Sequence, residues 1–84
     1  MAKKRIDLSI GLDVDEILGK IKNRYILEKI TDIDGVKIEF EQERKWVHLR
    51  KSNTEPIIRI YAEAPEKEIA ESIADQIIND IKTL

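Results

Sequence analysis

Apolar and polar residues alternate in several short runs of the chain, and this two-residue period is typical of strands with one buried face. The first run covers residues 5–10, where Ile6, Leu8 and Ile10 alternate with polar residues. Similar runs predict strands on both sides of residues 34–35, at 46–50 and at 57–63. In the last run, Ile58, Ile60 and Ala62 share one face, which we expect to be buried.

Two other segments have the three-to-four-residue period of an amphipathic helix. The first begins near Asp13, a good N-cap residue, and Glu16 completes a capping-box-like pair. Gly19 lies inside this helix at a cost of about 1 kcal/mol relative to alanine, which we interpret as a place of close packing on a sheet. The second helix follows Pro65. The apolar positions are Val14, Ile17, Leu18, Ile21 and Tyr25 in the first, and Ile69, Ala70, Ile73, Ala74, Ile77 and Ile81 in the second.

The dipeptide Asp34-Gly35 predicts a hairpin with a two-residue type I′ turn, because that turn needs positive φ at both central positions. With this turn Thr31 faces Ile38 across the hairpin, and Ile30 points to the opposite face. A metal-binding interpretation of the same aspartates is disfavoured, since an EF-hand loop needs further spaced oxygen ligands.

The resulting order is β-α-β-β-β-β-α within a single domain, residues 1–84. Two amphipathic helices of this kind most simply cover one face of a mainly antiparallel sheet, so we predict an α+β fold, a two-layer sandwich.

Composition narrows the functional classes. The chain has no cysteine, which excludes disulfides and cysteine-based metal sites. The N-terminus lacks the apolar run of a secretory signal, and no stretch approaches the roughly 18 apolar residues of a membrane helix. We therefore expect a cytoplasmic protein that does not contact membranes. A net charge of −2 disfavours global attraction to nucleic acid, so any anion site must be local.

Positive charge is concentrated around one polar loop. Residues 44–59 contain five basic residues and a single acid. Arg50 offers a planar fork of donors for two phosphate oxygens, and Ser52, Asn53 and Thr54 add hydroxyl and amide donors. Pro56 stiffens the exit of the loop, and Arg59 returns on the next strand.

On residues alone, this loop has two interpretations: an ordinary hairpin turn, rich in turn-forming residues, or an anion site. Three neighbours are assigned structural roles. His48 is expected on a strand, since no base–nucleophile pair surrounds it. Trp46 and Tyr61 are expected to pack against a helix or a neighbouring domain rather than to stack on bases.

The segment RKSNTEPIIRIYAEA, residues 50–64, resembles the phosphate-binding signature of the α-D-phosphohexomutase superfamily. DGVKIEF and WVHLR upstream are also similar to that family, and the likeness extends from about Ile6 onward. One departure precedes Trp46, where the family often has a glycine and this chain has QERKW. The residues that match the signature are Arg50, Ser52, Asn53, Thr54, Glu55, Pro56 and Arg59.

The resemblance is to the C-terminal domain, the fourth of four domains around one cleft, which has a TATA-box-binding-protein-like fold in this family. It implies that Arg50, Ser52, Asn53 and Thr54 contact a substrate phosphate. Arg59 would support that phosphate at its edge, and Glu55 and Pro56 would hold the loop.

The parent enzyme implied by the resemblance is an isomerase that acts on phosphoglucose, phosphomannose or phosphoglucosamine substrates. Its partners are a hexose 1- or 6-phosphate, the bisphosphate intermediate and the other three domains. Its phosphoserine and Mg²⁺ belong to those other domains, so we expect no cofactor in this one and no mutase activity from it alone. The alternative is a free-standing module that binds a sugar phosphate or single-stranded nucleic acid.

Overall fold

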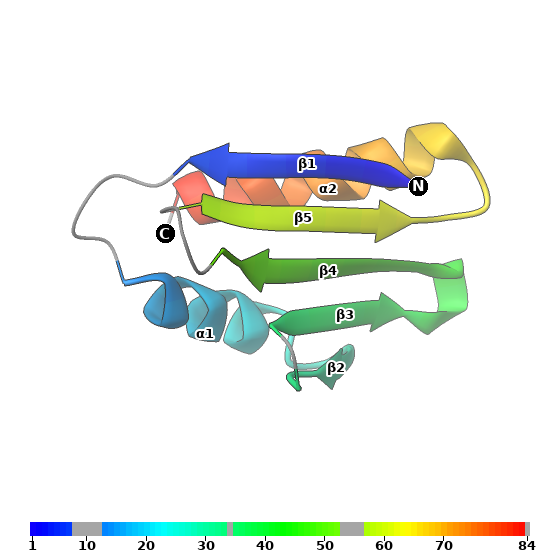
Figure 1. The fold of residues 1–84 in the computed structure, drawn as a ribbon. Helices are drawn as coiled ribbons and strands as arrows, with labels where there is room; N and C mark the ends of the chain where they lie inside the picture. Colours follow the sequence, from blue (N-terminus) through cyan, green and yellow to red (C-terminus); the bar gives the residue numbers. More distant parts are fainter. Residues whose placement is uncertain (8–12, 34, 53–56, 84) are drawn as a thin grey trace.

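The computed structural model describes residues 1–7, 13–33, 35–52 and 57–83. Within them, five strands form one antiparallel sheet with the order β1-β5-β4-β3-β2 (Figure 1). The predicted element order and the α+β class are confirmed. The elements are β1 Ala2–Asp7, α1 Val14–Arg24, β2 Lys29–Thr31, β3 Val36–Phe40, the 3-10 turn η1 Glu41–Glu43, β4 Lys45–Lys51, β5 Ile57–Glu63 and α2 Lys67–Lys82.

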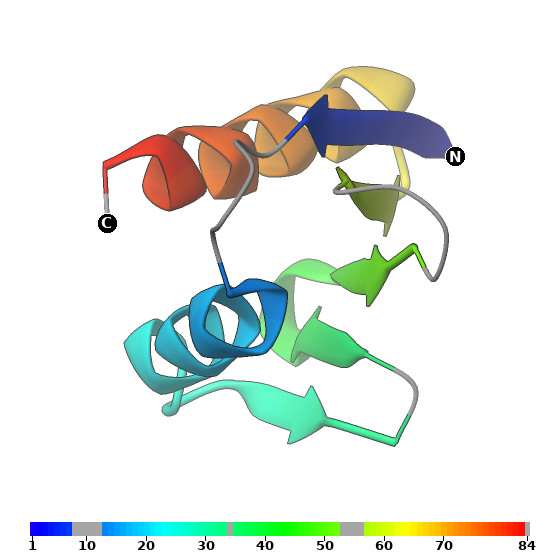
Figure 2. The ribbon, with the colours of Figure 1, turned by 60° about the vertical axis from the view of Figure 1, so that its left-hand side comes forward.

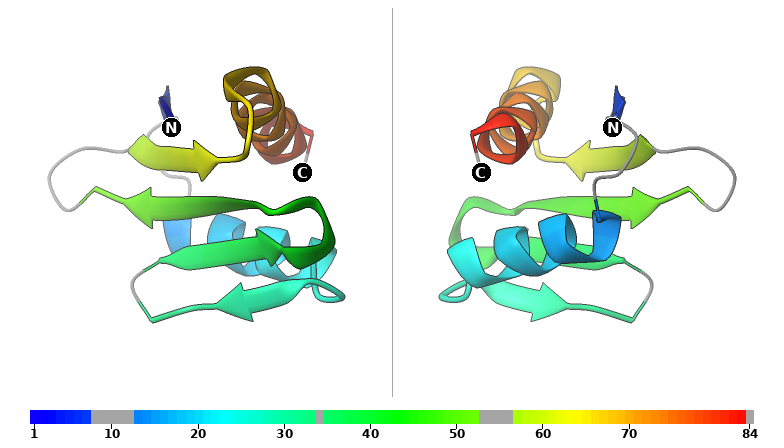
Figure 3. Two further views of the ribbon diagram at one scale, coloured as in Figure 1. Left: turned by 90° about the vertical axis from the view of Figure 1, so that its right-hand side faces the viewer. Right: turned by 90° about the vertical axis from the view of Figure 1, so that its left-hand side faces the viewer.

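Both helices lie on the same face of the sheet. Helix α2 covers β5 and β1, and α1 packs against β3 and contacts α2 (Figure 2). Figure 3 shows α1 behind the strands in one view and in front of them in the opposite view. We call the sheet face that points away from the helices the outer face. No helix among the described residues is long and apolar enough to span a membrane.

The core between sheet and helices is built mainly from isoleucine. Each fully buried aliphatic side chain contributes about 1.5–3 kcal/mol relative to an exposed one. Ile69 is an exception to the predicted stripe of α2, because it is 38% exposed at the edge of the core. The largest fully buried side chains are Ile21, Ile38, Val47, Leu49, Ile58, Ile60 and Ile77.

The predicted register of the first hairpin is wrong by one residue. Thr31 pairs with Lys37, and Ile30 pairs with Ile38. The observed register puts Ile30 on the core face beside a fully buried neighbour, whereas a two-residue turn would have turned it outward. Burial of an isoleucine therefore decided the register over the local turn preference. Asp34 lies outside the described residues.

One strand boundary differs from expectation, and one connection has an unusual backbone conformation. Strand β1 begins at Ala2 and ends at Asp7, so it starts earlier than the predicted run, whose residues 8–10 are outside the described part of the chain. Before β4, Arg44 adopts a left-handed conformation with φ 55° and ψ 37°. This is the connection where the family often has glycine, and an arginine there costs roughly 1–2 kcal/mol.

The first helix begins at the predicted cap residue, Asp13, but the Glu16 side chain pairs with Lys20 and does not complete the predicted capping box. The Asp13 carboxylate accepts hydrogen bonds from the backbone N–H groups of Asp15 and Glu16, at 3.0 and 3.3 Å. The Glu16 side chain forms an ion pair with Lys20 at 3.4 Å. At the other end, the Tyr25 hydroxyl donates to Asp80 of α2, and burial together with this hydrogen bond raises the pKa of Tyr25.

Gly19 and Gly35 differ in whether the surrounding structure has room for a side chain. A Cβ added to Gly19 would meet no described heavy atom within 4 Å, so the expected close packing is wrong. Gly35 has φ +86°, and a Cβ there would lie 2.1 Å from the Leu49 carbonyl oxygen. Of these two described glycines, only Gly35 is required by the fold.

We therefore expect Gly19→Ala to raise the free energy of unfolding by about 0.5–1 kcal/mol, because alanine restricts the unfolded chain and favours helix. Gly35→Ala should lower it by more than about 1 kcal/mol, because its backbone conformation excludes a side chain. Urea denaturation of the two variants tests both signs. Destabilisation by Gly19→Ala would contradict the open space next to Gly19.

Candidate functional site

The described residues of the predicted site meet at one end of the sheet. Arg50, near the end of β4, lies directly opposite Arg59 of β5 in the strand register. Both side chains are exposed on the outer face. The Ser52 backbone N–H donates to the Ile57 carbonyl oxygen at 3.2 Å, which closes the base of the β4–β5 connection. We call this end of the sheet, at the left of Figure 1, the loop end.

The remaining predicted site residues belong to that connection and lie outside the described residues. Their proposed contacts with phosphate therefore stay predictions. They are Asn53, Thr54, Glu55 and Pro56.

A third arginine lies beside the predicted site, and sequence reasoning did not identify it. Arg5 of β1 is the register partner of Arg59, and it is also exposed on the outer face. Arg5, Arg59 and Arg50 thus form a row across three adjacent strands, which spans about 10 Å at the usual strand spacing. We call this set the arginine row. The alternation around Ile6 placed Arg5 on the polar face, but only the pairing of β1 with β5 brings it beside Arg59.

Such a row is unfavourable for the stability of the sheet. Like charges directly opposite each other on neighbouring strands destabilise a sheet. In the part of the chain that the structure describes, neither Arg5 nor Arg59 forms an ion pair with a carboxylate. A bound anion would offset the repulsion between Arg5 and Arg59.

The next row of the outer face is also basic. Lys3, Tyr61, His48 and Lys37 lie in register across β1, β5, β4 and β3. His48 is on a strand, as expected. Trp46 and Tyr61 point away from the helices, so packing against a helix within this chain is wrong for both. The Lys37 ammonium lies 4.7 Å from the centroid of the Trp46 ring, a cation–π contact.

On the helix side of the loop end, two ion pairs connect the elements. Lys51 at the end of β4 lies 3.1 Å from Asp15 of α1. Lys22 pairs with Asp32, and this hydrogen bond lowers the pKa of the Asp32 carboxyl. These contacts surround a depression of about 360 Å³ between α1 and the ends of β3 and β4. Its two lysines are paired with these aspartates, and Arg50 is also among its lining residues.

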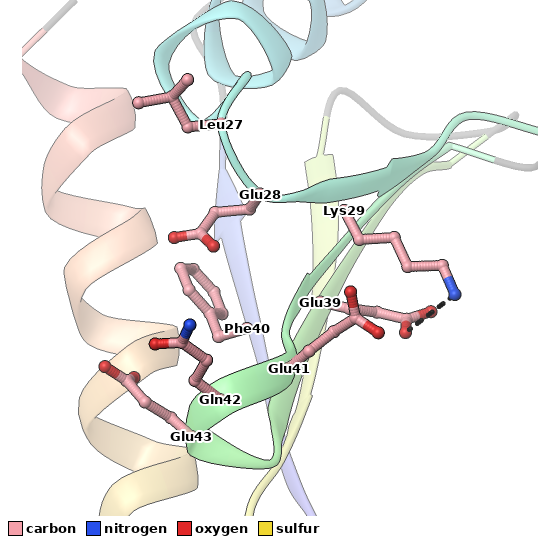
Figure 4. A pocket seen from close by; sticks show the side chains of 8 residues that line it. All are labelled: Leu27, Glu28, Lys29, Glu39, Phe40, Glu41, Gln42 and Glu43. Atoms are coloured by element: carbon pink, nitrogen blue, oxygen red, sulfur yellow. Dashed lines mark ion pairs between the residues drawn. The ribbon is translucent and has the colours of Figure 1, made fainter.

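The opposite end of the sheet is acidic. A pocket of about 290 Å³ lies beside η1, and four glutamates and one lysine are among its lining residues (Figure 4). Lys29 and Glu39 form an ion pair there at 3.9 Å. Among residues 1–7, 13–33, 35–52 and 57–83, no group of three or more histidine, aspartate or glutamate side chains could hold a metal ion. The glutamates of this pocket are Glu28, Glu39, Glu41 and Glu43.

Comparison with known proteins agrees with the signature. The sequence profile of the family "Phosphoglucomutase/phosphomannomutase, C-terminal domain" matches residues 3–80. A phosphoglucosamine/phosphogalactosamine mutase of Sulfurisphaera tokodaii is 42% identical over 86 residues, which cover all of this chain and 18% of that protein. A probable phosphoglucosamine mutase of Pyrococcus horikoshii is 35% identical over 84% of this chain and 15% of its own. Another, of Methanosarcina acetivorans, is 41% identical over 75% and 15%.

The arginine row predicts a measurable repulsion. We expect a double-mutant cycle of Arg5→Gln and Arg59→Gln to give a repulsive coupling energy of about 0.2–1 kcal/mol in low salt. The coupling should nearly vanish in 1 M NaCl, where screening acts within about 3 Å. Urea denaturation of the four proteins at both salt concentrations measures it.

Lys4→Gln provides the matched control cycle with Arg59→Gln. Lys4 is adjacent to Arg5, but its side chain lies on the helix face, where it binds Asp75. Its coupling to Arg59 should be close to zero. An attractive or absent coupling between Arg5 and Arg59 in low salt would contradict the row.

Proposed function

The chain belongs to the phosphoglucomutase/phosphomannomutase C-terminal domain family, and on that premise we propose that its loop end binds the phosphate group of a phosphosugar. Arg50 provides a two-pronged donor, and Arg59 supports the phosphate from the facing strand. Ser52, Asn53 and Thr54 contribute short polar donors, while Glu55 and Pro56 hold the loop. The observation that carries the proposal is the direct cross-strand pairing of Arg50 with Arg59 beside the family signature.

The chemistry of this site is binding rather than bond breaking. Arginines hold a phosphate dianion by charge-assisted hydrogen bonds but offer no nucleophile and no general base at neutral pH. Fixing a remote phosphate orients the rest of the substrate for a reaction elsewhere. We therefore propose that this chain alone has no mutase activity.

The parent enzyme would be a phosphohexomutase, an isomerase that transfers a phosphoryl group within its substrate. The chain spans less than a fifth of the length of the relatives described above. Their names refer to phosphoglucosamine, and one also to phosphogalactosamine, which favours a hexosamine phosphate as the substrate. In that enzyme, Mg²⁺ would be held by other domains, and this domain would close the cleft over the bound phosphate.

A second candidate, single-stranded nucleic acid, draws support from the basic outer face with Trp46 and Tyr61. Against it, the register neighbours of Trp46 are Glu39 and Glu63, which would repel a phosphate backbone near the aromatic ring. Salt dependence separates the two candidates, because an oligonucleotide releases several counterions and a single phosphate group very few.

The proposal is tested by NMR titration of the 84-residue chain with glucosamine 6-phosphate. We expect saturable amide shifts centred on residues 50–59, with affinity in the millimolar range, since a single phosphate group is held on one side only. Arg50→Ala should weaken binding about tenfold or more, because a hydrogen bond to a charged group contributes about 1.5–3 kcal/mol. Arg50→Lys should recover only part of the loss, since it keeps the charge without the fork.

Lys29→Ala is the control, because it removes a cation at the acidic end of the sheet and should leave the affinity unchanged. Folding of every variant is checked by the dispersion of its amide spectrum. Shifts that avoid residues 50–59, or an Arg50→Ala variant that is folded and binds normally, would contradict the proposal.

A further inference from the structure

A shallow depression of about 220 Å³ lies on the sheet at its β1 edge. Its lining residues are Lys3, Lys4, Arg5, Arg59 and Tyr61, and none of them is acidic. Drug-sized ligands usually occupy pockets of about 300–1,000 Å³. The depression is therefore suited to one small polar group rather than to a whole sugar phosphate.

Strand register arranges four of these side chains at the corners of a small rectangle on the outer face. Arg5 is opposite Arg59, and Lys3 is opposite Tyr61. Lys4 also lines the depression, but its ammonium group binds Asp75 on the helix side, so Lys4 is not one of the four corners. At standard strand geometry, the corners are about 5 Å apart across the strands and about 7 Å apart along them. We call this rectangle the β1–β5 patch.

The four corners of the β1–β5 patch are three cationic side chains and one neutral hydroxyl group, and none of them is anionic. Two guanidinium groups and one ammonium group can each donate to an oxyanion, and the Tyr61 hydroxyl can donate one further bond. Three positive charges face one another there, and within the described part of the chain none of Lys3, Arg5 and Arg59 has a carboxylate partner. An oxyanion with two negative charges would offset that repulsion and satisfy several donors at once.

We propose that the β1–β5 patch is a second anion site, which binds a phosphate dianion separately from the loop. This second site depends on the proposed function only because Arg59 belongs to both sites. Arg50 and Lys3 are two strands and about two residues apart, which is about 12 Å between their backbones. We therefore infer that a phosphate held by Arg50 leaves the ammonium group of Lys3 available to a second anion.

The source of the dianion is either free inorganic phosphate or the phosphate group of an ester such as a phosphosugar. Inorganic phosphate and a phosphate ester both present negatively charged phosphate oxygens to the patch. The proposal therefore names a phosphate dianion, and the titrations below identify its source. The phosphate site proposed at Arg50 and the β1–β5 patch would then be two phosphate subsites that share Arg59.

The test is a pair of NMR titrations of the 84-residue chain, one with inorganic phosphate and one with glucosamine 6-phosphate. We expect a second set of saturable shifts at the amides of residues 3–5 and 61, distinct in midpoint from those at residues 50–52. Equal midpoints for the two ligands at the patch identify free phosphate as sufficient, and tighter binding of the ester identifies a phosphosugar. Either result supports the site.

Variants separate the two subsites. Arg5→Gln should weaken binding at the patch about tenfold and leave the response of residues 50–52 unchanged, whereas Arg50→Gln should do the reverse. Tyr61→Phe, which removes only the hydroxyl, should weaken the patch several-fold. Lys29→Gln is the control, because it removes a positive charge from β2, the opposite edge strand of the sheet, and should not change binding at the patch.

Three outcomes would overturn the second site. Patch shifts that disappear with Arg50→Gln would show that one phosphate causes both responses, and the proposed function would then stand alone. Patch shifts equally sensitive to Lys29→Gln and Arg5→Gln would show a diffuse charge effect. Shifts caused by a hexaglutamate peptide and not by phosphate would assign the face to an acidic protein surface. Loss of the response at residues 50–52 alone would instead contradict the proposed function.

Discussion

The structure depends on the antiparallel pairing of β5 with β1 on one side and β4 on the other. This register places Ile58, Ile60 and Ala62 in the core with no measurable exposure. The same register necessarily places Arg59 and Tyr61 on the outer face, between the side chains of β1 and β4. A shift of one residue would bury the charges and expose the isoleucines, so the apolar core fixes the geometry of the arginine row.

The core and the outer face have opposite effects on stability. The isoleucines between sheet and helices contribute the hydrophobic free energy on which a small domain without disulfides depends. The arginine row reduces that free energy, because its members repel one another across the strands. Four glutamates line the pocket beside η1, whereas Arg50 and Arg59 face each other at the loop end, although the whole chain is slightly acidic.

Local patterns predicted most elements, and non-local contacts explain what they missed. Strand β5 has the predicted bounds, because its alternation is uninterrupted, and Asp13 caps α1 as its position suggested. The first hairpin has a different register because burial of Ile30 outweighed the turn preference of residues 34–35. Arg5 could not be assigned to the site, since alternation gives the face of a residue and not the neighbour of its strand. Gly19 was misjudged for a related reason: a sequence does not reveal whether space remains above a helix. The contacts of residues 53–56 rest on the family signature alone.

In the proposed phosphate site, Arg50 and Arg59 at the loop end hold the phosphate in its dianionic form. The most direct measurement is the second ionisation of glucosamine 6-phosphate bound to the chain, followed by ³¹P NMR across a pH series. A free phosphate monoester has a second pKa of about 6, and neighbouring guanidinium groups stabilise the dianion. We expect the pKa of the bound phosphate to be lower by about one unit or more, and to return toward the free value with Arg50→Gln. An unchanged or raised pKa in the bound ligand would contradict it.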